Sequence, residues 1–264
     1  MLPKIQLFSA YHKSFPLMPK ADYVTPIQSG AIDAATRLAM PGDDTGENIS
    51  HLGSTYNEIS VAYWVLKNAD RSSFDAWGLC QYRRYFIQDK YKLYLKKRSR
   101  YYFRTSQDVM DKILSPALYL HLQKFLAQND VIVQRPTWAM KQKGIAYGIK
   151  DAYTNLHIKE HYDITMEVVI EKFPDFAGSI ESYGKLKKMS YHSMMIARWS
   201  VWDDYIYFLM TVLTEVKLRI VAPKEGYQSR VEGFLAERLH NLYMYHHQLK
   251  QAFVTIGLFE DELK

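Results

Sequence analysis

Two adjacent arginines, Arg83 and Arg84, follow a short apolar run and are the strongest chemical signal in the sequence. The run, residues 76–80, is typical of a buried strand. A guanidinium is always charged and is seldom placed at the edge of a core without an anionic partner. Two of them side by side could form a fork for a phosphate or diphosphate, which Arg binds in a bidentate manner. The alternative is a pair of surface arginines whose stems rest on neighbouring aromatic rings.

No other motif indicates a familiar catalytic centre. The glycine-rich phosphate loops are absent in both their Rossmann and Walker forms, which argues against a dehydrogenase, a kinase or an NTPase. There is no nucleophile-elbow motif, and Cys80 lies inside the apolar run. His157 and His161 have the spacing of a metal-binding pair on a helix but lack the accompanying glutamate, so no metal site is predicted.

The composition is that of a globular protein with an excess of positive charge. Apolar residues make up 48% of the 264 residues, aromatic residues make up 14%, and the net charge is +6. A single cysteine excludes a disulfide framework and suits a reducing compartment. The sequence shows no signal peptide and no apolar stretch of about 20 residues. We therefore expect a soluble, cytoplasmic protein.

Part of the positive charge is concentrated between Lys90 and Arg104, where Lys and Arg are interleaved with aromatic residues. This pattern could rest on an anionic membrane surface, line a nucleic-acid groove, or form a solvated charged face. No zinc-finger, RNP or helix-turn-helix signature supports nucleic-acid binding. Peripheral contact with the anionic inner-membrane surface is the favoured functional interpretation.

Strands and helices alternate in the first half of the chain. Residues 4–10 predict a first strand, and a turn-rich loop over 41–48 leads to a helix over 56–68. The strand before the arginine pair follows this helix, so the β-α-β order predicts a parallel sheet. Its carboxyl edge is where open α/β sheets bind ligands. Such a unit could hold a nucleotide, with ring stacking on Tyr11, polar contacts from Asp44 and Asn48, and the arginines on the phosphates.

The second half predicts mostly helices. The expected helices lie over 108–128, where Pro116 breaks or starts a helix, and over 153–173, 199–219 and 230–249. The expected strands lie over 130–134 and 191–197. No internal repeat or low-complexity linker is present. We expect a single domain over 1–264, with a donor-binding half up to about residue 150 and a mostly helical, acceptor-side half over about 151–264.

The chain resembles a bacterial family, formerly a domain of unknown function, that is associated with glycosyltransferases of capsular and exopolysaccharide synthesis. The resemblance covers most of the chain, and its motifs are residues 11–13, 23–30, 44–50, 57–59, 63–64, 67–68, 78–86, 191–198 and 230–239. Two positions depart from the family pattern. Gln81 stands where the family usually has His, and Ser193 stands where it generally has Asn.

The resemblance implies a GT-A-like α/β fold, an open nucleotide-sugar-binding sheet flanked by helices with a helical C-terminal half. The implied activity is transfer of a hexose from a nucleoside-diphosphate sugar, with UDP as the expected nucleotide. Galactose, in its pyranose or furanose form, is one candidate for the hexose. The acceptor would be a lipid-linked intermediate of capsular or exopolysaccharide synthesis, and the anomeric centre is expected to invert. The alternative is a non-catalytic basic, aromatic module that binds anionic glycan or membrane in a polysaccharide-assembly complex.

The resemblance also implies roles for single residues. Most GT-A enzymes hold Mn²⁺ or Mg²⁺ on the diphosphate with Asp-x-Asp, whereas this chain has Gln81-Tyr82-Arg83 at that place. We therefore expect no metal requirement, because the arginines would neutralise the departing diphosphate. An inverting transfer also needs a base. The candidate bases are Glu237 and Glu232, with Asp163 behind them, and the alternative for Glu237 is an ion pair with Arg238 or Arg230.

The remaining expected site residues fall into two groups. The donor side comprises Tyr11, His12, Lys13, Asp44, Asn48, Glu58, Tyr82, Arg83 and Arg84, and the acceptor side comprises His157, Ser193 and Arg230. Within the first group, Glu58 is expected to orient a neighbour, such as an arginine, rather than to act as the base.

Overall fold

The computed structural model describes residues 1–88, 99–223 and 225–260, and the chain divides into two compact units. Unit 1 consists of residues 1–135, 194–202 and 250–264, and unit 2 consists of residues 136–193 and 203–249. These bounds differ from the expected division near residue 150. The chain leaves unit 1 after residue 135, returns for residues 194–202, and returns again after residue 249.

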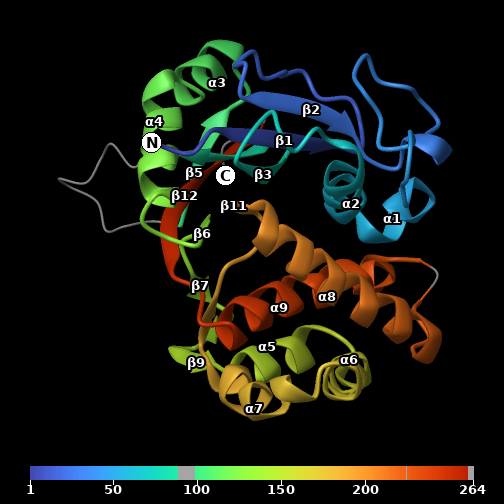
Figure 1. Ribbon diagram of the computed structural model, residues 1–264. Coiled ribbons are helices and arrows are strands. Elements are labelled where there is room, and N and C mark those ends of the chain that lie inside the picture. Colours follow the sequence, from blue (N-terminus) through green and yellow to red (C-terminus); the bar gives the residue numbers. More distant parts are fainter. Residues whose placement is uncertain (89–98, 224, 261–264) are drawn as a thin grey trace. The chain divides into compact units, whose positions relative to one another are not determined.

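Unit 1 is built on an eight-stranded mixed sheet (Figure 1). β1 is parallel to both β2 and β3, β11 is antiparallel to β3 and β6, and the last strand, β12, pairs with β4, β5 and β6. The strands are β1 (Ile5–Tyr11), β2 (Val24–Gln28), β3 (Ala76–Gln81), β4 (Arg84–Ile87), β5 (Arg100–Arg104), β6 (Val131–Gln134), β11 (Met195–Arg198) and β12 (Gln251–Glu260).

The arginine pair lies at a hairpin turn. Gln81 pairs with Arg84 at the junction of β3 and β4, which leaves Tyr82 and Arg83 in the turn. A two-residue connection can join only antiparallel strands, whereas parallel strands need a long crossover. The full sheet is therefore mixed. The expected parallel pairing holds for β1 with β2 and β3 and for β12 with β5 and β6, whereas β4 and β11 pair antiparallel with their neighbours.

Helices cover both faces of the unit 1 sheet. α3 and α4 bury Met110, Leu118 and Leu122 in one cluster with Leu7 of β1 and other residues of β1, β3, β6 and β12. On the opposite face, Trp77 of β3 stacks on Trp202, with ring centroids 3.9 Å apart. The helices are η1 (Ala31–Asp33), η2 (Ser50–Leu52), α1 (Gly53–Tyr56), α2 (Glu58–Asn68), α3 (Gln107–Ile113) and α4 (Pro116–Leu126).

Unit 2 is mostly helical, with two short strand pairs, β7 with β10 and β8 with β9. Its elements are β7 (Thr137–Trp138), β8 (Met140–Gln142), β9 (Ile145–Tyr147), α5 (Ile149–Leu156), α6 (Lys159–Lys172), η3 (Pro174–Phe176), α7 (Ala177–Lys185), β10 (Lys188–Met189), η4 (Tyr227–Arg230), α9 (Val231–His246) and α8 (Trp199–Arg219), whose first turn belongs to unit 1. In the described part of the chain, no helix is both long enough and apolar enough to cross a membrane.

The stretch expected over 108–128 is divided into α3 and α4, with the second helix starting at Pro116 as expected, and two helices expected to be continuous are also divided in two. The helix expected over 56–68 is interrupted at Asn57, whose φ is 49°, in the left-handed region that side chains other than Asn, Asp and Gly rarely adopt. The helix expected over 153–173 is interrupted at His157, which is extended with a φ of −138°. His157 and His161 therefore do not share one helix, and the spacing of a helical metal-binding pair does not apply to them.

Burial of His240 on α9 predicts that acid destabilises the protein. This side chain is fully buried, and burial lowers its pKa to about 4. An unfolded histidine has a pKa near 6.5, so between these values the unfolded state binds more protons and stability falls as the pH falls. We expect the step from about pH 7 to about pH 5 to cost about 2 kcal/mol of unfolding free energy through His240 alone.

Urea denaturation of the wild type and of His240→Phe at both pH values measures this effect. The variant should lose about 2 kcal/mol less than the wild type over the same interval. Burial also lowers the pKa of His157 to about 4, and this residue is present in both proteins. It therefore contributes the same loss of unfolding free energy to the wild type and to the variant. Equal losses in the two proteins would contradict the prediction.

Candidate functional site

The carboxyl ends of β1, β2 and β3 meet at one edge of the unit 1 sheet, because these strands are parallel. Around Tyr82, this edge brings together three residues that the sequence indicated. The His12 ring packs edge-on against the Tyr82 ring with centroids 4.9 Å apart, Lys13 Nζ lies 5.9 Å from the centroid of that ring, and Arg83 Cζ lies 5.7 Å from it. The result is a cluster of basic side chains around a buried aromatic ring.

Tyr11 belongs to the core beneath this edge. Only 1% of its surface is exposed, its hydroxyl donates a hydrogen bond to the Leu17 carbonyl at 3.0 Å, and the same hydroxyl lies 3.1 Å from the Tyr85 hydroxyl. Burial raises the pKa of Tyr11 to about 12. The expected stacking of a nucleotide ring on Tyr11 is therefore wrong, because its ring has no accessible face.

Glu58, Gln81 and Arg84 form a chain of polar contacts across the face of β3. The Gln81 amide nitrogen donates to the Glu58 carboxylate at 2.8 Å, and the Gln81 amide oxygen accepts a hydrogen bond from Arg84. A carboxylate only accepts and a guanidinium only donates, so the amide between them has a single productive orientation. Glu58, the first residue of α2, contacts the arginine site through Gln81, which agrees with its expected orienting role.

The two guanidinium groups of the hairpin are partly buried and close to each other. Burial lowers the pKa of Arg84, and the positive charge of Arg83 lowers it further. The Nε atoms of Arg83 and Arg84 are both buried, and neither has a hydrogen-bond partner among the described residues. A buried donor without a partner is costly, and it is uncommon in native structures. The pair therefore leaves two buried donors and their positive charge uncompensated by the described residues.

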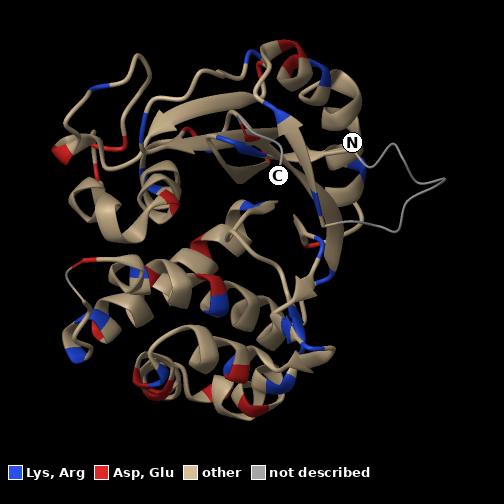
Figure 2. Cartoon of the chain, turned by 180° about the vertical axis from the view of Figure 1, so that it is seen from behind, with Lys and Arg blue, Asp and Glu red and all other residues tan. Residues whose placement is uncertain are grey.

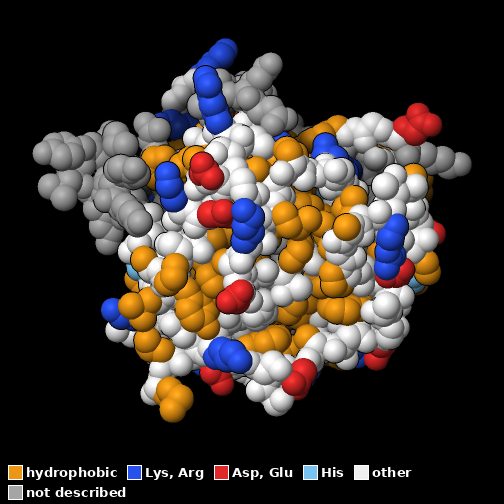
Figure 3. All heavy atoms as spheres, turned by 90° about the horizontal axis from the view of Figure 1, so that it is seen from above, with side chains coloured by type: hydrophobic (Ala, Val, Ile, Leu, Met, Phe, Trp, Pro, Cys, Tyr) orange, Lys and Arg blue, Asp and Glu red, His pale blue; other side chains and the backbone are white. Residues whose placement is uncertain are grey.

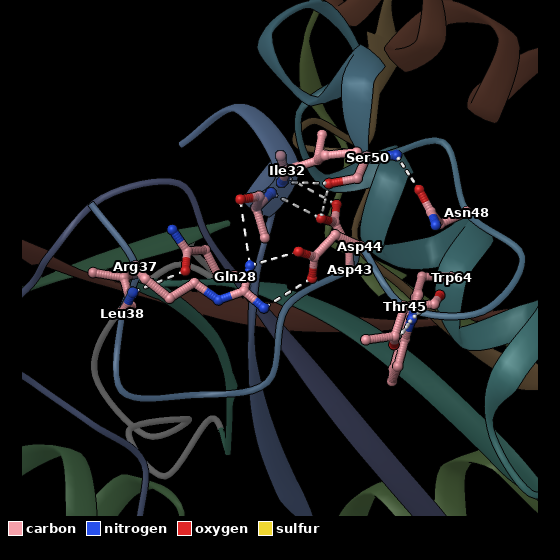
Figure 4. A network of polar contacts seen from close by, with 12 residues as sticks. Gln28, Ile32, Arg37, Leu38, Asp43, Asp44, Thr45, Asn48, Ser50 and Trp64 are labelled. Carbon is pink, nitrogen blue, oxygen red and sulfur yellow. Dashed lines mark hydrogen bonds and ion pairs between the residues drawn. The ribbon is translucent and has the colours of Figure 1, made fainter. Parts of the chain in front are cut away.

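Asp43 holds the loops at this edge together (Figure 4). It precedes Asp44, which was expected on the donor side of the site. Asp43 is fully buried, and its carboxylate accepts hydrogen bonds from the backbone N–H groups of Gly30 and Ala31, at 2.9 and 3.0 Å, and from the Ser50 hydroxyl. These bonds tie the loop after β2 to the start of η2. The carboxylate is satisfied by the protein itself.

Asp44 and Asn48 also bind other parts of the loop. Asp44 forms a bidentate ion pair with Arg37, at 2.7 and 2.9 Å, and this pair lowers the pKa of the Asp44 carboxyl. Asn48 donates to the Gly46 carbonyl and accepts from the Ser50 N–H. Both side chains therefore stabilise the 43–50 loop in this structure, and the expected direct contact with a nucleotide stays a prediction.

In unit 2, Glu237 is held by two contacts. One carboxylate oxygen accepts the His192 N–H at 2.9 Å, and the other pairs with Arg238 Nη1 at 3.1 Å. Arg238 is only 3% exposed and lies over the Tyr153 ring, so this pair is largely buried. The ion pair that was the alternative for Glu237 is therefore present, and Glu237 also holds a turn whose residues His192 and Ser193 both have positive φ.

The other unit 2 candidates lie in different surroundings. Glu232 is 3% exposed, and its Oε2 atom has no hydrogen-bond partner in the described part of the chain. His157 stacks on Phe234 and contacts Gln228, and burial lowers its pKa to about 4. The three remaining residues are buried Ser193, exposed Arg230 at the end of η4, and Asp163, which pairs with lysines on α5 and α6.

The residues at the hairpin do not fit a divalent cation. Two guanidinium groups repel a cation, and the amide oxygen of Gln81 already accepts a hydrogen bond from Arg84. Hard cations such as Mg²⁺ need carboxylate or free carbonyl oxygens. No group of three or more His, Cys, Asp or Glu side chains is arranged to hold a metal within the described residues.

Three residues of these networks were absent from the predicted site, namely Gln81, Asp43 and Arg37. Gln81 had a readable signal, because it is the one strongly polar residue at the end of a fully buried strand. Nothing in the sequence distinguished buried Asp43 from its partly exposed neighbour Asp44. That distinction depends on the positions of Gly30 and Ser50, which only the fold brings together.

Asp43→Ala should lower the unfolding free energy by about 2–4 kcal/mol, because three buried donors lose their acceptor. Asp44→Ala is the matched control on the adjacent residue. It removes an exposed ion pair and should cost at most about 1 kcal/mol. Urea denaturation of both variants checks the prediction, which fails if the two substitutions cost the same.

Comparison with known proteins identifies the family and the fold. The solved apo structure of WbbM, a bifunctional glycosyltransferase, superposes with a TM-score of 0.86 at 22% sequence identity. The match covers 97% of this chain and 45% of that chain, so this chain spans less than half of WbbM. This likeness confirms the α/β fold class expected from the sequence.

A search of curated protein sequences finds no match. A family model described as a domain of unknown function (DUF4422) matches residues 6–248, which is most of the chain. This match confirms the expected kinship with a family first described in that way. The chain belongs to the DUF4422 family.

Proposed function

We propose that this protein is a glycosyltransferase that binds a nucleoside-diphosphate sugar at the arginine hairpin of unit 1. The observation that carries the proposal is the pair of buried, unpartnered Nε donors of Arg83 and Arg84 at the carboxyl edge of parallel strands. A diphosphate supplies the acceptor oxygens and the negative charge that these donors lack. The fold shared with a bifunctional glycosyltransferase supports the same reading.

In the proposed reaction, an acceptor hydroxyl attacks the anomeric carbon while the bond from that carbon to the diphosphate oxygen breaks. Negative charge then grows on the departing nucleoside diphosphate, and the two guanidinium groups stabilise it. The proton of the acceptor hydroxyl passes to a carboxylate. We propose a hexose as the transferred sugar, UDP as the nucleotide, a lipid-linked glycan intermediate as the acceptor, and inversion at the anomeric centre.

Of the two proposed bases, Glu232 is the better supported. Its Oε2 atom has no partner among the described residues, whereas both oxygens of Glu237 are engaged, by His192 and by Arg238. A general base needs an oxygen that can meet the acceptor hydroxyl, and a hydrogen bond or an ion pair already occupies each oxygen of Glu237. We assign proton transfer to Glu232 and the positioning of the His192 turn to Glu237.

The proposed reaction uses no metal ion. The charge that Mn²⁺ or Mg²⁺ would supply comes from Arg83 and Arg84, which need no chelating carboxylates. Metal independence is part of the proposal, and a chelator tests it directly.

Nucleotide binding tests the donor site. UDP should raise the melting temperature of the wild type, because a ligand that binds only the folded state stabilises it, and the rise should persist in EDTA. Arg83→Ala and Arg84→Ala should each weaken UDP binding by about tenfold or more, the effect of losing hydrogen bonds to a charged group. Calorimetric titration gives the affinities.

Lys92→Ala, which lies outside the described residues, is the control for loss of one positive charge. It should weaken UDP binding far less than either arginine variant. Equal effects of lysine and arginine removal would contradict the diphosphate assignment, and a response to UDP that needs Mn²⁺ would contradict metal independence. Absence of any response to UDP, GDP or CMP would favour a non-catalytic binding module instead.

Conservative glutamate variants separate the two proposed roles in unit 2. Glu232→Gln should lower kcat by about 100-fold or more while leaving the unfolding free energy within about 1 kcal/mol of the wild type. Glu237→Gln should instead lower stability by about 1–3 kcal/mol, because it removes the charge that faces buried Arg238. Sugar-transfer assays and urea denaturation measure both quantities. A large loss of kcat in Glu237→Gln and a loss of stability in Glu232→Gln would contradict the assignment and make Glu237 the base.

A further inference from the structure

A cationic region of unit 2 consists of exposed lysines and apolar residues on the two segments that pair at Trp138. We name it the Trp138 patch, and it comprises Lys141, Lys143, Lys187 and Lys188 together with Trp138, Ile145 and Leu186. Residues 136–150 and 185–193, which form it, contain no Asp or Glu. Figure 2 shows Lys and Arg gathered on these short strands.

Backbone pairing brings the two segments of the patch together. Lys188 pairs with Trp138 across β10 and β7, and the Ala139 N–H donates to the Lys187 carbonyl at 2.9 Å. Two ammonium groups flank the indole: Lys188 Nζ lies 4.7 Å from the Trp138 ring, and Lys141 Nζ lies 5.6 Å from it. The arrangement fixes positive charge beside an aromatic ring that is 42% exposed.

The β8–β9 hairpin presents the outer part of the patch. Gln142 pairs with Ile145, and the two residues between them, Lys143 and Gly144, have φ values of 47° and 85°. Two positive φ values in a two-residue loop are those of a type I′ turn, which holds the hairpin in a tight, defined shape. The turn exposes Lys143. Ile145, which pairs with Gln142 and is 60% exposed, lies on the other face of the hairpin from Lys141, so the hairpin presents a lysine on one face and an aliphatic side chain on the other.

We infer that the Trp138 patch docks the protein on an anionic lipid bilayer. The lysines match the negative charge of such a surface. An exposed Trp suits the headgroup level, and exposed aliphatic residues suit the boundary below it. A polyanion such as nucleic acid or acidic glycan would use the lysines but would leave Ile145 and Leu186, which is 38% exposed, in water. The aliphatic residues therefore favour lipid.

The charge at the Trp138 patch differs from that on the face shown in Figure 3. There, acidic and basic side chains lie interspersed among the coloured atoms, which is ordinary for a solvated surface. Membrane contact was expected between Lys90 and Arg104, but residues 89–98 lie outside the described structure. The Trp138 patch is a different surface on a different unit.

Vesicle sedimentation tests the inference with the full chain. The wild type should bind vesicles that mix phosphatidylcholine with phosphatidylglycerol far more tightly than vesicles of phosphatidylcholine alone. Lys141→Gln/Lys188→Gln should weaken binding to the anionic vesicles roughly thirtyfold, about fivefold for each lysine near the surface. Ile145→Ser should weaken it about fivefold without affecting binding to heparin.

Lys124→Gln/Lys217→Gln is the matched control, because it removes two exposed lysines outside the patch and leaves the same net charge. Circular dichroism shows that each variant is folded. Equal binding of the wild type to neutral and anionic vesicles would overturn the inference, as would equal losses in the two double variants. Lysine-dependent binding to heparin with no binding to vesicles would also overturn it and assign the patch to a polyanion.

Discussion

The repulsion between two guanidinium groups on adjacent residues is the constraint around which unit 1 is arranged. Arg83 and Arg84 are partly buried at a hairpin turn, where water screens their charges poorly. A carboxylate placed directly on Arg84 would relieve the repulsion but would also neutralise the pair. Glu58 instead contacts the neutral amide of Gln81, which in turn accepts a hydrogen bond from Arg84. The proposed diphosphate would neutralise the charge that this arrangement leaves on the pair.

The position of Glu58 depends in turn on the loops that precede α2. Buried Asp43 fixes the loop after β2 to η2, and Gly30 then approaches Gly53 so closely that a side chain on Gly53 would meet the Gly30 backbone at 2.3 Å. The Ser29 hydroxyl also donates to the Asn57 carbonyl at 2.8 Å, just before α2 begins. A run of buried polar contacts therefore leads from Asp43 to the arginine pair.

The chemistry of the hairpin was predictable from residue types, but its geometry was not. An apolar run that ends in Arg83 and Arg84 is visible in the sequence, and so are the long helices and β6. The burial of Tyr11, which prevents a nucleotide ring from stacking on it, was not predictable. A tyrosine at the end of a strand can point either into the core or into solvent. The partnership of Glu237 with Arg238 was foreseen as an alternative, and only the burial of Arg238 decided that it was present.

The position of β12 has a consequence for how the chain is made. This strand pairs with β4, β5 and β6. It was not among the expected strands, although its β-branched and aromatic residues favour strand structure. Until residues 251–260 leave the ribosome, those three strands lack their shared neighbour, while every residue of unit 2 has already been synthesised. Unpaired strand edges associate readily with other chains. The sheet of unit 1 can therefore be completed only after every residue of unit 2 has been synthesised, when β12 pairs with these three strands.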